Sequence, residues 1–542
     1  MPDGKGIVAP RSDPGALDVV VCGAGPVGLT AAALLARRGL KVAVLERNEA
    51  TSDEPKAISI DDEALRVFQQ AGIVDAVLDI VVPGTGTRYY DSAGSPLFHA
   101  RAAWPLRFGY PFKNPFAQPD LEKVLVSTLA ALPNVTLHFG TEVTAVEQTA
   151  NGARVCASHG AQRHYFDATY VFGCDGGRSA IRQMHGVTMS GRSHSEVWLV
   201  VDTVADTHTE RYAMHHGDPH RPHVIVPGLN GRCRYEFRLF DGEGDTGVDP
   251  PFELIRHLVS RYRALQPEHI ERAVNYRFNA LVANQWMIGR SFLLGDAAHM
   301  MPPFAGQGLN SGIRDAANLA WKVADVIDGR LDEGVLDSYE RERRPHAAAT
   351  VRLSEQLGRI VMTTSKRMAQ RRDSLVRMAV GTSEGRNYLE HMRYRPLQHY
   401  TEGLVIGADR ADLVGVPIGQ PLVFDSAAHR LGRLDDILGD GWAILAVDLL
   451  DDKWCGLDDV IRAFDVTTAA VTTRDTLPHS TRRVLIDVDR GLQRELSDYT
   501  GRFVLLRPDR FVAAAWLPPA SPEICAQLLR WSAHNVAVPA AI

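Results

Sequence analysis

The sequence predicts an α/β fold of several domains, and three observations lead to this prediction. The chain has 542 residues, whereas a single domain usually has about 100–200. Short runs of β-branched residues alternate with helical stretches, which is typical of sheets with parallel strands. The composition, with 45% hydrophobic and 23% charged residues, is that of a folded globular protein and excludes a disordered, collagenous or coiled-coil chain.

The charge balance and the hydropathy exclude two classes of partner. Lysine and arginine number 59 against 65 aspartates and glutamates, a formal net charge of −6, so nothing attracts the chain to nucleic acid or to an anionic membrane. No apolar run approaches the roughly 18–20 residues of a membrane span. Residues 1–14 are polar and lack the apolar core of a signal peptide, so we expect a flexible N-terminus and a cytoplasmic protein.

The cysteines and histidines give no sign of a metal site or a dithiol. None of the six cysteines forms a C-x-x-C pair, which removes the usual zinc-ribbon and redox spacings. Cys22 and Cys174 lie in apolar stretches and are interpreted as small buried hydrophobes. The histidines between residues 215 and 223 fit no zinc pattern, so we expect no metal.

The first informative segment is a strand, a glycine-rich turn and a helix. Residues 17–22 are predicted to be a buried parallel strand, and the turn Gly23-Ala24-Gly25-Pro26-Val27-Gly28 follows it. In a Rossmann-like unit these glycines allow a tight turn, close approach of a pyrophosphate and close helix packing. A second strand ends at Glu46, where a carboxylate accepts hydrogen bonds from the adenosine ribose and disfavours NADP. The residues assigned to the dinucleotide are Gly23, Gly25, Pro26, Val27, Gly28, Glu46 and Arg47.

Two later motifs favour a flavin over a nicotinamide as the bound dinucleotide. Asp175-Gly176 follows a predicted strand, and Gly295-Asp296 follows another. Asp296 can accept hydrogen bonds from ribityl hydroxyls, and the glycine-rich turn after it lets N–H groups approach the flavin pyrimidine edge. The dipole of the next helix, capped by Asn310 or Ser311, would stabilise negative charge there. The residues assigned to FAD in these segments are Asp175, Gly295, Asp296, Pro302, Gly306, Gly308, Leu309 and Asn310.

Together the three motifs resemble the aromatic-ring hydroxylases, the single-component FAD-dependent monooxygenases typified by para-hydroxybenzoate hydroxylase. The strings at residues 60–66, 218–222 and 234–237 are similar to the branch that hydroxylates 3-(3-hydroxyphenyl)propionate. The resemblance implies that Gln118 lies near the flavin. It also places Lys56 where many relatives carry an arginine. A lysine there keeps the positive charge but loses the two-pronged hydrogen bonding of a guanidinium.

The resemblance further implies an interleaved architecture. A Rossmann-like FAD-binding domain would use residues 15–80, 115–190 and 280–365, and a β-sheet substrate domain would use residues 81–114 and 191–279. Residues 366–400 look like a helical linker. Residues 401–542 resemble a thioredoxin-like domain without C-x-x-C, so we expect a structural role, with a homodimer as one possibility.

The activity implied by the resemblance is hydroxylation of a phenolic ring with NAD(P)H and O2. NADH is preferred by likeness to the phenylpropionate branch, and the nicotinamide would bind transiently because the chain has no second dinucleotide fingerprint. A small hydroxyphenyl acid is the first substrate hypothesis. Larger polycyclic or polyketide phenols and a non-hydroxylating flavoprotein are the alternatives.

The residues that bind and activate the phenol are less clearly marked. His216 and Tyr235 are the candidates for catalysis, and Phe304 is expected to face the substrate. Residues 234–239 alternate polar and apolar, which predicts either a solvated face opposite the core or, alternatively, Arg234 or Tyr235 near the ring pocket. For a substrate carboxylate the candidate partners are Arg107, Arg234 and Arg238.

Overall fold

The computed structural model describes residues 17–84, 86–101, 106–407, 413–472 and 482–533, so the predicted flexible segment 1–14 lies outside it. Its first sheet has the strand order β16-β17-β10-β1-β2-β7. Strand β1 lies between β2 and β10 and is parallel to both. The strands are β1 (Leu17–Cys22), β2 (Val42–Leu45), β7 (Val135–His138), β10 (Gln162–Gly173), β16 (Met287–Ile288) and β17 (Ser291–Leu293).

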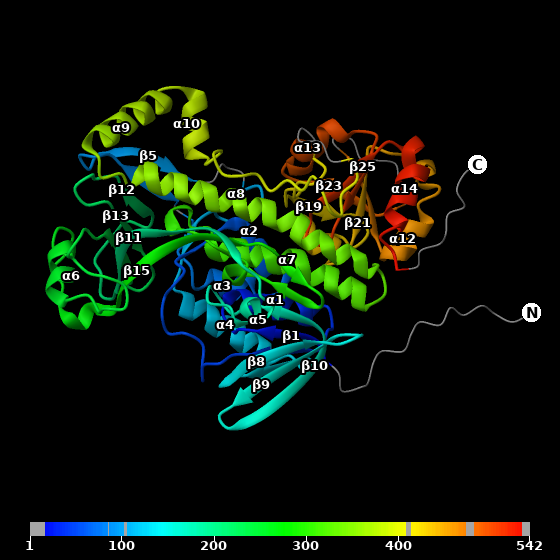
Figure 1. Cartoon of the computed structure of the whole chain (residues 1–542). Coiled ribbons are helices and arrows are strands. Elements are labelled where there is room, and N and C mark those ends of the chain that lie inside the picture. The colour runs from blue at the N-terminus through cyan, green and yellow to red at the C-terminus, as the bar shows by residue number, and fades with distance from the viewer. Residues whose placement is uncertain (1–16, 85, 102–105, 408–412, 473–481, 534–542) are drawn as a thin grey trace, which may run out of the picture.

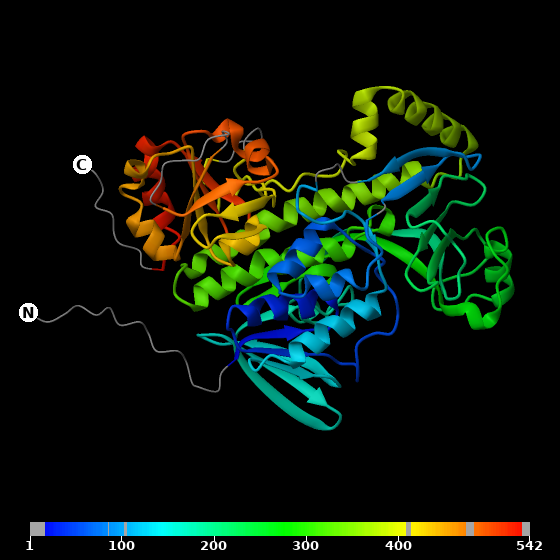
Figure 2. The same ribbon diagram turned by 180° about the vertical axis from the view of Figure 1, so that it is seen from behind.

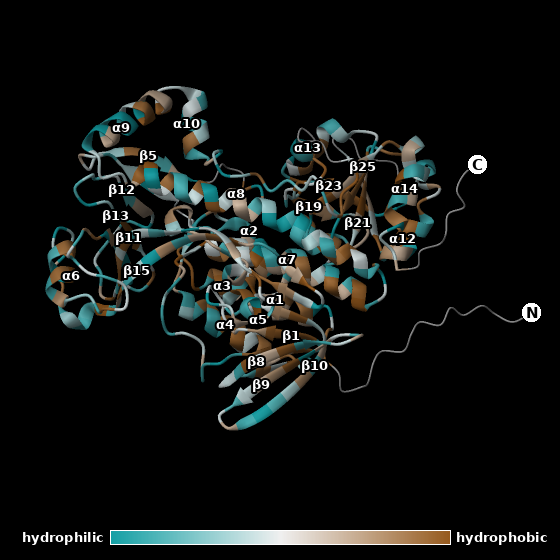
Figure 3. Ribbon diagram, viewed as in Figure 1, coloured by the Kyte–Doolittle hydropathy of each residue, from teal (hydrophilic) through white to brown (hydrophobic). Residues whose placement is uncertain are grey.

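Small residues let the helices of this domain pack closely on one another and on the sheet. Helix α1 (Pro26–Arg37) contacts both α4 (Gln118–Ala130) and α7 (Gly308–Ile327). Its Gly28 is required, because a Cβ there would lie 2.1 Å from the carbonyl oxygen of Gly23. The central strands form the apolar interior (Figure 3). A hairpin of β8 (Thr141–Gln148) and β9 (Ala153–His159) extends the sheet beside β10 (Figure 1).

The second sheet has the order β18-β15-β11-β14-β13-β12-β4-β5. Its outer face packs against helix α6 (Phe252–Val259) through an apolar cluster that includes Ile225 and Phe237. Its inner face is turned toward the first domain. The strands are β4 (Thr87–Tyr90), β5 (Pro96–Ala100), β11 (Met189–Thr203), β12 (Ala213–His216), β13 (His223–Pro227), β14 (Cys233–Arg238), β15 (Ile270–Ala283) and β18 (His299–Met300).

The expectation of a solvated face on β14 is wrong. Arg234 and Glu236 are both buried on the inner face, and Tyr235 is buried on the outer face. The polar alternation arises because α6 covers one side of the strand with apolar contacts, whereas the other side meets ion-pairing groups.

Helix α8 (Ser338–Val361) runs across the molecule, and two helices, α9 (Lys366–Val380) and α10 (Ser383–Glu390), follow it. The C-terminal α/β unit has a seven-stranded sheet of order β20-β19-β23-β22-β21-β24-β25. This unit and the second sheet lie at opposite ends of the first domain (Figures 1 and 2). Among the described helices, none is long and apolar enough to cross a membrane. The C-terminal strands are β19 (Leu422–Asp425), β20 (Arg430–Arg433), β21 (Ala443–Val447), β22 (Thr467–Val471), β23 (Val484–Asp487), β24 (Phe503–Leu506) and β25 (Val512–Trp516).

Candidate active site

The glycine turn leaves the N-terminus of α1 open for an anion. Gly23 has φ +109°, and a Cβ on it would lie 2.5 Å from the carbonyl oxygen of Cys174, whereas a Cβ on Gly25 would meet nothing within 4 Å. The first helical bond runs from the Leu29 N–H to the Gly25 carbonyl. In the described part of the chain the N–H groups of Val27 and Gly28 therefore have no acceptor, and they are available to a pyrophosphate.

The acid at the end of β2 is held against this turn. One carboxylate oxygen of Glu46 accepts the Ala24 N–H at 2.9 Å, and the other accepts the Asn48 N–H at 3.0 Å. Arg47, the next residue, is exposed. These two hydrogen bonds fix the carboxylate at the end of β2, which is where the acid of a Rossmann-like motif binds the ribose.

The Asp-Gly and Gly-Asp motifs are joined by one side chain. Arg182 donates to the Gly177 carbonyl at 2.8 Å and to the Ala297 carbonyl at 3.0 Å. Asp175 accepts the Ile181 N–H with one oxygen, while its other oxygen is buried without a partner. Asp296, which follows Gly295 at the end of the second of these motifs, is exposed. An orphaned carboxylate oxygen and an open carboxylate fit a cofactor with hydroxyl donors.

The loop before α7 is tied to the first domain by Asn310. Its amide donates to the Gly306 carbonyl at 2.7 Å and to the Ser59 carbonyl at 3.2 Å, and it accepts the Asp61 N–H at 3.0 Å. Because Asn310 is used in this way, it does not cap the helix, contrary to the prediction. Ser311 does not either, because α7 begins at Gly308 after Gln307.

The N-terminus of α7 is also open. Its first bond runs from the Ser311 N–H to the Gln307 carbonyl. The N–H groups of Gly308 and Leu309 therefore have no acceptor in the described part of the chain, and they can face a flavin edge. Pro302 precedes the short helical turn Pro303–Ala305, and Gly306 ends it with φ +62°.

Gln118 and Arg234 hold the main chain of the Lys56 loop. Gln118 accepts the Ala57 N–H at 2.8 Å, and it donates to Glu122 at 2.7 Å. Arg234 donates to the Lys56 carbonyl at 2.7 Å and forms a two-bond ion pair with Asp202. The Lys56 side chain itself is exposed. Gln118 and Arg234 thus act as positioning residues for a loop that borders the crevice.

A row of paired residues crosses the inner face of the second sheet. Strand register places Glu236 opposite Val224, Val224 opposite His215, and His215 opposite Tyr89. Neither Glu236 nor His215 has a hydrogen-bond partner among the described residues; the closest cation to Glu236 is Arg234 at 3.8 Å. Burial raises the pKa of Glu236. Burial, then the charges of Lys113 and His216, lower the pKa of His215 to about 3.

Phe304 adds an apolar wall beside this row. Its ring packs edge-on to Trp198 at 5.3 Å and to Phe278 at 5.5 Å between centroids. Val224, from the row itself, belongs to the same buried cluster. An aromatic wall next to buried polar groups that have no hydrogen-bond partner is typical of a pocket for a small ring with polar substituents.

The structure does not bring His216 and Tyr235 to this face. His216 stacks on His223 at 4.3 Å between centroids, on the outer side of the sheet. Tyr235 lies in the cluster under α6 and donates to Asp206 at 2.9 Å. Strand alternation separates adjacent residues in this way. His215 is the histidine of β12 that faces inward.

Two candidate arginines also lie apart from the row. Arg107 pairs with Glu495 of the C-terminal unit at 2.7 Å. Arg238 lies on the inner face of β14, two residues beyond Glu236. Its nearest hydrogen-bond acceptor is the Met362 carbonyl at 3.4 Å, a Glu196 carboxylate oxygen lies 3.6 Å from its guanidinium, and its Nε is buried without a partner.

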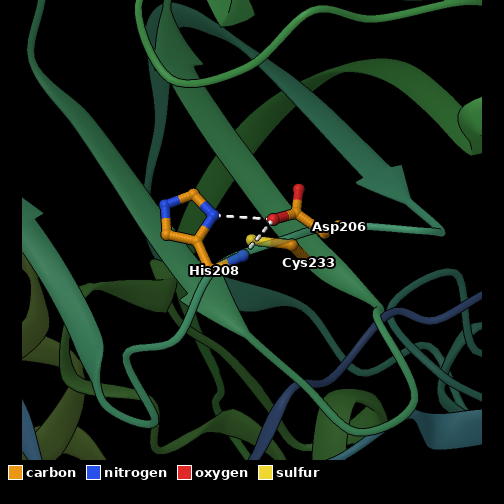
Figure 4. A group of neighbouring side chains, drawn as sticks. All are labelled: Asp206, His208 and Cys233. Atoms are coloured by element: carbon orange, nitrogen blue, oxygen red, sulfur yellow. Dashed lines mark hydrogen bonds and ion pairs between the residues drawn. The ribbon is translucent and has the colours of Figure 1, made fainter.

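Asp206, His208 and Cys233 form a compact group on the outer side (Figure 4). Asp206 accepts from the His208 ring at 2.7 Å, from Tyr235 at 2.9 Å and from Arg263 at 3.0 Å. These donors use both carboxylate oxygens, and a guanidinium already supplies the positive charge. The group is therefore explained as a hydrogen-bonded anchor for the loop after β11.

Sequence reasoning did not single out Lys113, His215 and Glu236 as candidate site residues. The two-residue alternation along β12 and β14 could have identified the latter two, once the inner face was known. Nothing in the sequence around Lys113 marks it, because its position depends on contacts with distant segments.

Comparisons with known proteins identify the family and the fold of the chain. Residues 16–354 match the FAD binding domain family, and residues 415–531 match the HcaD C-terminal domain family. The crystal structure of aklavinone-11 hydroxylase with FAD and aklavinone has a TM-score of 0.77 and 23% identity, covering 95% of this chain and 98% of that one. The flavin-dependent monooxygenase PieE with FAD and substrate has a TM-score of 0.78 and 20% identity, covering 95% and 99%.

The chain therefore belongs to the FAD-dependent aromatic-ring hydroxylases and is a flavoprotein monooxygenase. Within this family it is similar over nearly its whole length to a 3-(3-hydroxy-phenyl)propionate/3-hydroxycinnamic acid hydroxylase. That relative, from Mycolicibacterium smegmatis, is 36% identical over 536 residues, which cover 95% of this chain and 93% of the relative.

Proposed function

We propose that this enzyme hydroxylates a small hydroxyphenyl acid, 3-(3-hydroxyphenyl)propionate or 3-hydroxycinnamate, ortho to its hydroxyl group, with NADH and O2 as co-substrates. The observation that carries the proposal is the inner-face row, where Glu236 and His215 are buried without hydrogen-bond partners beside an aromatic wall. The name of the Mycolicibacterium smegmatis relative supports the choice of substrate.

The residues around the crevice would hold FAD in parts. The open N-terminus of α1 and Glu46 would bind the ADP half, and Asp296 would bind the ribityl chain. The N–H groups of Gly308 and Leu309 would meet the flavin edge. Bound FAD supplies the oxygen-activating redox chemistry, and the protein supplies position and a dry, polarised pocket.

His215 would orient the phenol. Its lowered pKa of about 3 keeps the imidazole neutral near pH 7. One ring nitrogen can then accept a hydrogen bond from the phenol O–H, and the ring N–H can donate one to the oxygen of the phenolate. Such an acceptor raises electron density on the ring. Phe304 and Trp198 would exclude water from one side of the substrate.

Arg238 would receive the substrate carboxylate. Its buried Nε without a partner is a donor in need of an acceptor, and a guanidinium suits a carboxylate. The C-terminal unit, thioredoxin-like in our prediction, would act in packing, because the chain has no C-x-x-C. Transient NADH binding, a homodimer and a cytoplasmic location stay predictions from the sequence.

The test is NADH oxidation in air with a panel of phenols, combined with the mass of the product. We expect strong stimulation by 3-(3-hydroxyphenyl)propionate and a product with one added oxygen atom. Stimulation without added oxygen would contradict the hydroxylation of that ring. A response only to polycyclic phenols would replace the small-acid substrate with the larger class.

A further inference from the structure

Lys113 is a buried cation without a partner. Its side chain is 9% exposed, and no described residue accepts a hydrogen bond from its ammonium or forms an ion pair with it. Burial, then the charge of Arg395, lower its pKa to about 8, and the charge of Asp61 opposes this change. A largely buried ammonium without a protein partner is costly. Because its Nζ is not among the fully enclosed unpartnered atoms, a ligand atom can reach it.

The backbone of Lys113 has an unfavourable conformation that hydrogen bonds of the next residue maintain. Its φ is +55°, in the left-handed region that non-glycine residues avoid. Asn114 fixes the turn, because its amide donates to the carbonyls of Pro111 and Ile60 and accepts the Gly84 N–H. Strained residues that the surroundings over-determine are concentrated at functional sites.

The ammonium lies where the candidate flavin loop meets the second sheet. Its Nζ is 3.8 Å from the position of a Cβ on Gly306, and its charge acts on His215. The acid nearest to it, Asp61, is already bound to Arg314 at 2.6 Å and to Gln307 at 3.2 Å. Asp61 therefore does not neutralise Lys113, and an anionic or strongly accepting ligand atom is the missing partner.

We propose that Lys113 is a substrate-binding residue that donates a hydrogen bond to the phenol oxygen of the aromatic ring and favours its phenolate form. This inference rests on the proposed function. The ring carbon that receives oxygen is a neighbour of the carbon that bears the hydroxyl group, so the phenol oxygen belongs near the Gly306 loop. The carboxylate belongs farther along β14, beside Arg238.

The experiment compares three ligands that differ in one group each. 3-(3-Hydroxyphenyl)propionate has both groups, 3-phenylpropionate lacks the hydroxyl, and 3-ethylphenol lacks the carboxylate. Their dissociation constants are measured on the FAD-loaded enzyme from the change in flavin absorbance. Lys113→Met is compared with Lys113→Arg, which keeps the charge, and with Lys123→Met, an exposed lysine of α4.

We expect Lys113→Met to weaken both phenols by about tenfold or more, as for a lost charge-assisted hydrogen bond, and to leave 3-phenylpropionate unchanged. Lys113→Arg should restore most of the affinity, and Lys123→Met should change none. In the unaltered enzyme the bound phenol should also ionise below its free pKa of about 10, and this shift should vanish in Lys113→Met.

Four other outcomes overturn the inference. Weaker binding of 3-phenylpropionate with unchanged 3-ethylphenol would assign Lys113 to the carboxylate. Equal weakening of all three ligands with loss of FAD would assign it to the cofactor or to the fold. If the unaltered enzyme binds neither phenol, the proposed function falls and this inference falls with it; if it hydroxylates the phenol and Lys113→Met binds all three normally, only the inference falls.

Discussion

His215 and His216 are adjacent in the chain, yet they face opposite sides of β12 and meet different chemistry. His215 lies inward beside Tyr89, with 5.0 Å between ring centroids. His216 lies outward, stacked between Tyr90 and His223. His216 also has a buried Nε2 without a partner. We therefore expect substitution of His215 to affect catalysis and substitution of His216 to affect stability.

Substitution of either histidine by phenylalanine keeps the ring stacking and removes the nitrogens. We expect His215→Phe to lower kcat/KM by about 100-fold, in the range for loss of a proton-accepting group. His216→Phe should leave kcat/KM essentially unchanged. Steady-state kinetics on FAD-loaded protein tests both, and a large loss in His216→Phe alone would return that residue to the catalytic role first predicted for it.

The same pair predicts a dependence of stability on pH. Burial, then His223, lower the pKa of His216 to about 3 from an ordinary 6.5. The unfolded chain therefore binds a proton below pH 6.5 that the folded chain does not, and His216 costs stability as the pH falls. His216→Phe lacks this titrating group. The free energy of unfolding of the variant should therefore rise relative to that of the unaltered protein by up to about 1.4 kcal/mol per pH unit below 6.5. Urea unfolding of both proteins at pH 7 and pH 5 measures it, and a constant difference would contradict the burial of a neutral imidazole.

Asp296 is the residue on which cofactor retention should depend most. Asp296 is exposed beside a turn that packs on α1, where a Cβ on Gly295 would lie 3.1 Å from Val27. We expect Asp296→Ala to weaken FAD binding by about 10- to 100-fold, as for a lost hydrogen bond to a charged group. The flavin absorbance per protein after dialysis measures it. A variant that stays fully yellow would contradict the assignment to the ribityl chain.

At the scale of elements, helix α8 packs closely on the loop before α7 at a position where α8 carries a glycine. A Cβ on Gly358 would lie 2.5 Å from the Phe304 ring, and that ring cannot move freely because Trp198 and Phe278 pack on it. Gly358→Ala would favour the helix by about 1 kcal/mol from propensity alone. It should nevertheless raise the KM for the phenol several-fold, because Phe304 is pushed into the pocket. Unchanged kinetics with higher stability would show that Phe304 does not line the substrate site.

The sequence was most informative where one element carries a whole motif. The turn at Gly23–Gly28 lies within a single strand–turn–helix unit, so local spacing was enough to predict its structure and its open helix end. The inner row of Glu236, Val224 and His215 joins three strands whose order and facing are set by α6 and the first domain. No local pattern contains that information, and the solvated face predicted for Arg234 was wrong for this reason.

At the scale of the whole molecule, the C-terminal unit is joined to the first domain by buried charges. Arg507, in the turn after β24, donates to both carboxylate oxygens of Glu342 in α8 at 2.8 and 2.9 Å, and Lys322 of α7 donates to the same carboxylate at 2.7 Å. All three side chains are fully buried. Burial raises the pKa of Glu342, but Arg507 and Lys322 outweigh it and lower the pKa to about 2. The residues are up to 185 positions apart (322 to 507), so the sequence alone could not pair them.

Removing one member of this network should lower the free energy of unfolding more than breaking an exposed ion pair between the same two units. Arg507→Met leaves Lys322 as the one cation paired with Glu342 among the described residues, and breaking a buried pair in this way costs about 3–5 kcal/mol. The matched control is Arg37→Met, which breaks the exposed pair with Asp440 across the same boundary and should cost less than about 1 kcal/mol. Urea unfolding followed by both flavin release and tryptophan fluorescence measures the two. Adding Asp509→Asn to Arg507→Met should recover part of the loss, because Arg507 also pairs with Asp509, and that carboxylate otherwise loses its cation. Equal effects of the two arginine variants would mean that the C-terminal unit is held by its apolar contacts, and that Glu342 does not link its stability to that of the FAD domain.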